Sequence, residues 1–206
     1  MNMRKVIAAF NMTLDGVCDH TTGVPSEDLH QHYADLLDHA GVILYGRTTY
    51  QLMQFWQSIL QNPSDKKSMN DFAIAIDKIQ KLVFSTTLKD AGWESATLAN
   101  QPLDEQVLAL KQQAGKDILI GSRSLIIQLL NHNLVDELQI CIHPVVEGKG
   151  LLLFDLRFHI HDNMDNVQYS FPNTLCILLS LEVHPSDLRQ IIFFYTESSL
   201  PHGVRR

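Results

Sequence analysis

The sequence predicts an α/β protein whose mixed, mostly parallel sheet has helices on both faces and ends in an antiparallel hairpin. Two observations support this fold class. Short apolar runs alternate along the chain with segments whose apolar residues recur at helical spacing, as in strands joined by crossover helices. Residues 93–98 are expected to form one of the short strands. Near the end, apolar runs at residues 175–183 and 190–196 flank the sequence His-Pro-Ser-Asp, which is typical of a hairpin turn.

One strand–turn–helix unit lies at residues 117–134. Asp117–Ile120 is apolar and too short for a helix, so it predicts a buried strand. Gly121 and Ser122 then break the run, and Leu125 begins a set of leucines at helical spacing. A strand that passes through small residues into a helix N-terminus can bind an anion, because the first N–H groups of the helix lack partners. A plain strand–helix turn is the alternative.

A second unit of the same kind lies at residues 41–56. Residues 41–45 form an apolar strand, and Gly46-Arg47-Thr48-Thr49 opens the helix that carries Leu52, Met53, Phe55 and Trp56. The glycine, the cation and the two hydroxyls suit an anionic ligand. In the alternative interpretation Arg47 is a solvated charge and Thr48 caps the helix.

Length and charge narrow the class of protein. The 206 residues predict a single domain, with residues 198–206 as a frayed tail. A net charge of −7 argues against a nucleic-acid partner, and no apolar run reaches membrane-spanning length. The three cysteines, Cys18, Cys141 and Cys176, form no C-x-x-C motif, so we expect free thiols in a reducing cytoplasm.

The ten histidines do not predict a metal site. The first helix, which Ser26 is expected to cap, carries His30, His32 and His39 away from its apolar stripe, so they are expected at the surface. His30 and His32 are two residues apart and do not face each other on a helix. The zinc deaminase signature H-x-E…P-C-x-x-C is absent. A metal-dependent hydrolase or deaminase is therefore disfavoured.

Several motifs together resemble the dihydrofolate-reductase-like family. They are Leu-Asp-Gly at 14–16, Gly-Arg-x-Thr at 46–49, Val-Phe-Ser-x-Thr-Leu at 83–88, Gly-Ser-x-x-Leu at 121–125, Leu-Val-Asp-Glu-Leu at 134–138 and Pro-Val-Val-Glu-Gly at 144–148. Within that family the chain is most similar to the C-terminal reductase domain of the riboflavin-biosynthesis deaminase–reductase and its stand-alone homologues. The resemblance covers residues 4–154 and, loosely, the final hairpin.

The resemblance implies a reductase that moves hydride from NADPH to a small heterocycle such as a pterin, a folate or a riboflavin-precursor pyrimidine. It implies a homodimer, with residues 144–154 as a plausible contact. A non-catalytic nucleotide-binding protein on the same fold is the alternative. The cofactor-binding residues it implies are Gly46, Arg47, Thr48, Thr49, Ser85, Thr86, Gly121, Ser122, Arg123 and Leu125.

The catalytic residue is less well indicated. Asp15 follows the first strand and is either a turn residue before Gly16 or a polar group at the reaction site. The carboxylate of true dihydrofolate reductases lies on the first helix, where this chain has Glu27, Asp28 and Asp35 in no recognisable context. The chain departs from the family's pattern at two more places. Ser122 stands where the family usually has glycine, and residues 155–173 form a long polar segment that we interpret as a variable loop.

Overall fold

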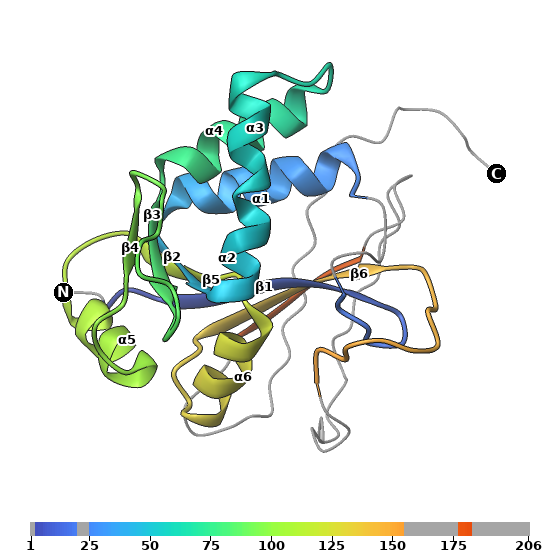
Figure 1. Ribbon diagram of the computed structural model, residues 1–206. Helices are drawn as coiled ribbons and strands as arrows, with labels where there is room; N and C mark the ends of the chain where they lie inside the picture. Colours follow the sequence, from blue (N-terminus) through green and yellow to red (C-terminus); the bar gives the residue numbers. More distant parts are fainter. Residues whose placement is uncertain (1–2, 20–24, 155–176, 183–206) are drawn as a thin grey trace.

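A computed structural model describes residues 3–19, 25–154 and 177–182. In this part of the chain a seven-stranded sheet has the order β4-β3-β2-β5-β1-β6-β7 (Figure 1). The elements are β1 (Val6–Thr13), α1 (Glu27–His39), β2 (Ala40–Gly46), α2 (Arg47–Met53), α3 (Phe55–Gln61), α4 (Lys67–Lys78), β3 (Gln80–Phe84), β4 (Ala96–Leu98), α5 (Leu103–Gln112), β5 (Asp117–Ile120), α6 (Arg123–Asn131), β6 (Glu137–His143) and β7 (Ile177–Glu182).

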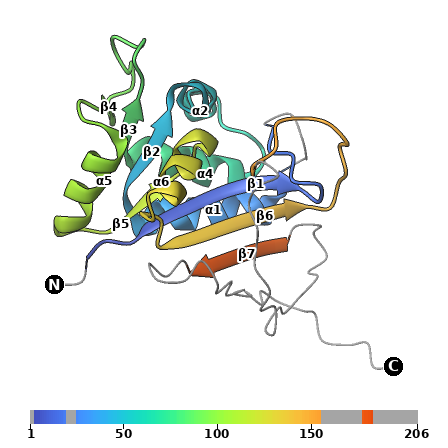
Figure 2. The same ribbon diagram turned by 90° about the horizontal axis from the view of Figure 1, so that it is seen from below.

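The predicted mostly parallel sheet is confirmed. Strands β1 to β6 pair in parallel with their neighbours, and β7 runs antiparallel to β6 along the edge of the sheet (Figure 2). β7 corresponds to the first arm of the expected hairpin, and the expected second arm at 190–196 lies outside the described residues. The segment 155–173 and the tail 198–206 also lie outside them.

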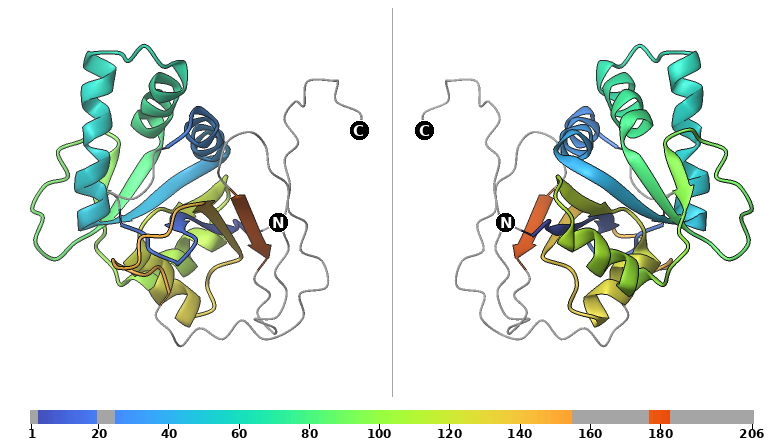
Figure 3. Two further views of the ribbon diagram at one scale, coloured as in Figure 1. Left: turned by 90° about the vertical axis from the view of Figure 1, so that its right-hand side faces the viewer. Right: turned by 90° about the vertical axis from the view of Figure 1, so that its left-hand side faces the viewer.

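Helices cover both faces of the sheet, as the alternating pattern predicted. α1 to α4 lie over one face, and α5 and α6 lie over the other (Figures 1 and 3). Alternate residues of β2 enter different cores: Leu44 packs in the core beneath α6, whereas Ile43 and Tyr45 pack in the core beneath α1 and α4. Both cores are apolar because a central parallel strand is buried on its two faces.

Two local predictions need revision. The expected helix through Phe55 is two short helices that meet at Gln54, where the Gln57 N–H bonds to the Gln54 carbonyl in an i to i+3 turn. The expected strand at 93–98 is only Ala96–Leu98, because a turn joins the Ala96 N–H to the Trp93 carbonyl. By contrast, Ser26 caps α1 as predicted, its Oγ accepting from the Leu29 N–H at 3.2 Å.

A buried lysine links β3 to the segment that precedes the edge strand β4. Lys81 on β3 is 1% exposed, and its Nζ donates to the Ile79 carbonyl at 2.9 Å and to Ser95 Oγ at 2.6 Å. The ammonium also lies 4.1 Å from the centre of the Trp93 ring, a cation–π contact. Burial lowers the pKa of Lys81 to about 8. The apolar residues around Lys81 in the sequence did not predict that its charged side chain is buried.

The cysteines differ from expectation. Cys18 is a free, buried thiol, as predicted. Cys141 on β6 is disulfide-bonded, so the expectation of three free thiols is wrong. Spacing along a chain does not reveal which cysteines a fold brings within bonding geometry. In the described ranges, no helix combines the length and the apolar character needed to cross a membrane.

Candidate functional site

The two strand-to-helix turns predicted from the sequence lie next to each other. β2 and β5 are neighbours, with Leu44 paired with Ile120, so Gly46 and Gly121 leave the sheet at the same carboxyl edge. The Gly46 N–H donates to Ser122 Oγ at 2.9 Å, and the Gly121 N–H donates to the Leu44 carbonyl at 3.2 Å. Ligands of open α/β sheets bind at this edge.

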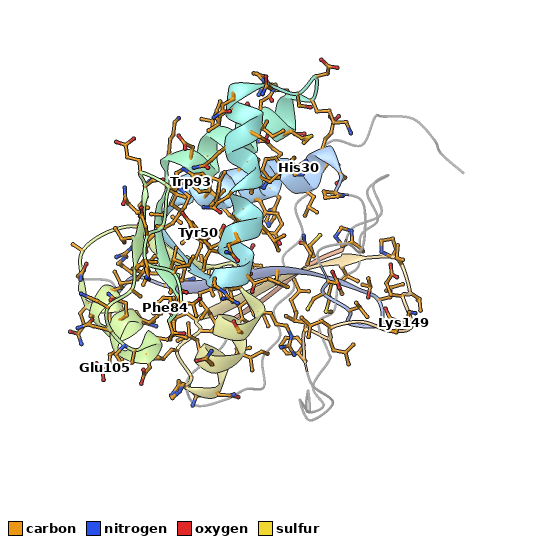
Figure 4. The ribbon with its side chains drawn as sticks, viewed as in Figure 1. His30, Tyr50, Phe84, Trp93, Glu105 and Lys149 are labelled. Atoms are coloured by element: carbon orange, nitrogen blue, oxygen red, sulfur yellow. The ribbon has the colours of Figure 1, made fainter. Side chains whose placement is uncertain are left out.

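One cavity opens beside the β2–α2 turn, and we call it the polar cavity. Its volume is about 560 Å³. It lies between this turn, the end of β3 and the first turn of α6, and Phe84 at the end of β3 is labelled in Figure 4. The residues that line it include five of the predicted cofactor-binding residues: Gly46, Arg47, Ser85, Thr86 and Leu125.

Hydrogen bonds order the rim of the polar cavity. Arg47 is exposed, and its Nη1 donates to Thr87 Oγ1 at 2.9 Å. Ser85 Oγ accepts from the Thr87 N–H at 3.2 Å and from the Leu88 N–H at 3.0 Å, which closes a tight turn of hydroxyl residues. A guanidinium and several hydroxyls at the rim of one cavity can donate hydrogen bonds to a phosphate.

The other predicted cofactor residues lie elsewhere. Thr48 is exposed and lines neither cavity, whereas Thr49 and Gly121 line the second cavity described below. Ser122 is 1% exposed, and its hydroxyl holds the Gly46 N–H. The Nε of Arg123 donates to the Leu152 carbonyl. Cofactor contacts by all ten predicted residues stay predictions.

Asp15 lies in an exposed turn and lines neither cavity. Its carboxylate accepts from Thr13 Oγ1 at 2.5 Å and from the Gly148 N–H at 2.7 Å. These hydrogen bonds lower the pKa of Asp15, which keeps the carboxyl ionised at neutral pH. The geometry favours the turn interpretation, in which Asp15 joins the loop after β1 to the loop that contains Gly148.

The second cavity, which we call the apolar cavity, lies on the helical side formed by α1 to α4. Its volume is about 320 Å³. Strands β1, β2 and β5 form its floor. Its walls are mainly apolar and aromatic, with Phe10, Met12, Leu29, Leu37, Ile43, Leu52, Met53, Trp56, Phe72 and Leu119 among the lining residues.

A few polar groups face this apolar cavity or lie at its wall. Tyr33 Oη donates to Asn11 Oδ1 at 2.6 Å, and burial raises the pKa of Tyr33, so the phenol stays protonated. His30 on α1 also lines the cavity, beside α3 (Figure 4), and its Nδ1 is buried with no hydrogen-bond partner. Burial lowers the pKa values of His30 and His143. The expectation that His30 lies at the surface is therefore wrong.

Sequence reasoning missed the apolar cavity because many separate elements build it. Trp56 on α3 lies against His30 on α1 and Phe72 on α4, with ring centroids 5.5 Å and 4.5 Å away. The large aromatic residues on these helices, which point toward a shared core, were the sequence feature that could have indicated the cavity. The distance between the helices decides whether these residues form a packed core or a cavity. The spacing of apolar residues along the sequence does not predict that distance.

Comparison with known proteins identifies the family. The sequence profile of the RibD C-terminal domain matches residues 4–162, and the chain belongs to this family. A protein of Bacillus subtilis (strain 168), "Uncharacterized protein YyaP", is 32% identical over 173 residues, which span 82% of this chain and 90% of the relative. The dihydrofolate-reductase-like fold predicted from the motifs is confirmed.

Solved structures share the fold at low identity. A putative riboflavin biosynthesis protein from Shewanella sp. PV-4 superposes with a TM-score of 0.55 at 19% identity, over 79% of this chain and 90% of the other. The deaminase/5-amino-6-(5-phosphoribosylamino)uracil reductase of Thermotoga maritima gives 0.58 at 13% identity, over 88% of this chain and 57% of that longer protein. The family and its structural neighbours thus include reductases.

Proposed function

We propose that this protein is a cytoplasmic, NADPH-dependent reductase that transfers hydride to a small heterocycle of the pterin, folate or riboflavin-precursor pyrimidine type. One observation carries the proposal. Two cavities of different character lie beside the two neighbouring strand–helix turns, one rimmed by a cation and hydroxyls and the other walled by aromatic rings. The phosphates of a dinucleotide match the cation and hydroxyls of the polar cavity, and a flat heterocyclic ring matches the aromatic walls of the apolar cavity.

The residues of the polar cavity fit the phosphate-bearing half of NADPH. Arg47 supplies a fixed positive charge, and Ser85, Thr86 and Thr87 supply hydroxyls around it. Leu103 and Leu125 add apolar surface for a purine ring. When bound, NADPH supplies a hydride, which is two electrons and one proton, and the substrate gains one further proton.

The residues of the apolar cavity orient the acceptor ring and exclude water. Trp56 and Phe72 provide faces and edges for stacking. The Asn11 oxygen accepts from Tyr33, which leaves the amide nitrogen as a donor to a ring nitrogen or carbonyl. The balancing proton comes from water or from a cavity histidine, because Asp15 is ionised and lies outside both cavities.

The test is a titration of NADPH and NADH against intrinsic tryptophan fluorescence. A charge-assisted hydrogen bond contributes roughly 1.5–3 kcal/mol, so Arg47→Ala should weaken NADPH binding by about 10- to 150-fold. NADH lacks the 2′-phosphate and should lose less. Lys78→Ala is the control, since Lys78 is exposed on α4 and lines neither cavity. A wild-type protein that binds neither nucleotide would refute the proposal.

A nucleotide-binding protein without turnover is the second candidate. The position of Asp15 favours it, because the sequence offered no other first-loop group for proton transfer. NADPH oxidation, followed by absorbance across a panel of pterins and flavin precursors, separates the two candidates. Oxidation above the buffer rate with any of them excludes the non-catalytic one.

We also propose a homodimer. The loop after β6 and the loop after β1 expose Leu14, Val145, Val146 and Leu151, and Val146 is 69% exposed. A second copy would cover this apolar surface. Light scattering should report twice the mass of one chain, and Val146→Asp should shift the protein toward the monomer.

A further inference from the structure

We infer that the substrate of the apolar cavity is a flat aromatic heterocycle that carries neither a phosphate nor a carboxylate. This inference rests on the proposed function and narrows its substrate class. Among the described residues, those that line the apolar cavity include no lysine or arginine. The one carboxylate among them is Asp19, which is exposed.

An anion would bind poorly in this setting. A charged group that leaves water for an apolar site loses hydration energy, which only a nearby cation or several donors can replace. The described walls offer mainly aromatic and aliphatic groups. The polar cavity differs, because Arg47 stands at its rim.

Arg123 is the described cation that approaches the wall of the apolar cavity, but it does not line the cavity. It approaches Cys18, a residue of the cavity wall, and its positive charge acts to lower the pKa of that thiol, although burial outweighs it and raises the pKa. Its Nε donates to the Leu152 carbonyl, and Arg123 is not among the lining residues. The guanidinium therefore ties α6 to the loop after β6.

The same walls favour a neutral ring. The cavity volume of about 320 Å³ accommodates a one- or two-ring heterocycle. Trp56, Phe72 and Phe10 offer ring faces and edges, and the Asn11 amide nitrogen offers a donor. His30 Nδ1 is a further hydrogen-bonding atom that lacks a partner in the described structure.

The substrate expected here differs in charge from that of the Thermotoga maritima protein. The Thermotoga maritima protein is by name a 5-amino-6-(5-phosphoribosylamino)uracil reductase, and a substrate of that kind carries a phosphate. In this chain, no cation in the described wall of the apolar cavity would meet such a group. The two proteins share the fold at 13% identity, and the charge of the ligand is where we expect them to differ.

The test compares pterin with pterin-6-carboxylate by isothermal titration calorimetry, using the full chain. Pterin should bind at least about tenfold more tightly, because no described wall residue offers a cation to the carboxylate. Equal or tighter binding of the carboxylate, or binding of neither compound, overturns the inference. A separate titration with NADP⁺ reports on the proposed function, so that the two failures are distinguishable.

A matched pair of variants tests the cause. Leu52 on α2 lines the cavity and is 41% exposed, so Leu52→Arg adds a cation at the rim with little disturbance of the core. The affinity for pterin-6-carboxylate relative to that for pterin should then rise about tenfold. Gln51→Arg, at an exposed position of α2 outside the lining, is the control and should change neither affinity. An unchanged ratio of the two affinities in folded Leu52→Arg would also overturn the inference.

Discussion

The polar and apolar cavities lie beside neighbouring strand–helix turns but are built differently. The polar cavity takes its chemistry from residues directly after strands, such as Arg47 after β2 and Ser85 after β3. The apolar cavity takes its walls from the faces of several helices, which meet over the sheet. Groups that follow a strand can be located from a motif, whereas a cavity between helices depends on how the helices pack.

The two turns between the cavities show the same contrast on a smaller scale. A Cβ on Gly46 would meet Ser124 Oγ at 3.4 Å, an ordinary contact. A Cβ on Gly121 would lie 2.7 Å from Tyr45 Cε1, inside the contact distance. Tyr45 is 3% exposed and lines the apolar cavity. Gly46 thus leaves room at its turn, whereas Gly121 is required by packing.

The largest expected effect is that of Gly121→Ala. Overpacking against Tyr45 should lower the free energy of unfolding by roughly 1–3 kcal/mol, and it should weaken pterin binding because Tyr45 moves toward the apolar cavity. Gly46→Ala is the matched control and should cost less than about 1 kcal/mol, the loss at an N-cap position. Urea unfolding of both variants measures the difference. Equal losses would mean that the two turns are equivalent after all.

Ser122→Ala should have the next largest effect. The Gly46 N–H would lose its acceptor in a partly buried setting, which costs about 1–2 kcal/mol of unfolding free energy. Ser124→Ala, at an exposed position on the same helix, should cost little. If Ser122→Ala leaves stability unchanged and weakens NADP⁺ binding instead, the hydroxyl serves the ligand as the family resemblance implies.

Sequence reasoning predicted the fold and the polar cavity better than the rest of the site. The strand ends at Gly46 and Gly121 were predictable because apolar runs stop there and glycine follows. The hydrogen bond from Gly148 to Asp15 was not, because 133 residues separate the partners. Ser122 and Arg123 carry suitable groups, but only the structure shows that each already has a protein partner.

The position of His30 explains another failure. Its place beside the apolar stripe of α1 predicted solvent exposure, but α3 packs against this side of α1 through Trp56. A helical period reports which face of a helix is most apolar, not how many neighbours the helix has. A second helix over α1 therefore buries a residue that the pattern assigned to the surface.

The smallest effect concerns pH and the histidines of the apolar cavity. Burial lowers the pKa values of His30 and His143, so between these values and about 6.5 the unfolded chain binds more protons than the folded one. The free energy of unfolding should therefore fall as pH drops below about 6.5. His143→Gln should flatten this slope, and His132→Gln, at an exposed position, should not. An unchanged slope in His143→Gln would contradict the assigned burial.

In the proposed function the two cavities hold two different ligands at the same time. The most direct measurement is calorimetric titration of NADP⁺ into the protein with and without saturating pterin, a pair that cannot react. We predict one NADP⁺ bound per chain in both cases, with little change in Kd, because the polar and apolar cavities share no lining residue. Loss of NADP⁺ binding when pterin is present would show that the two ligands compete for one site, which would contradict separate cavities for the cofactor and the substrate.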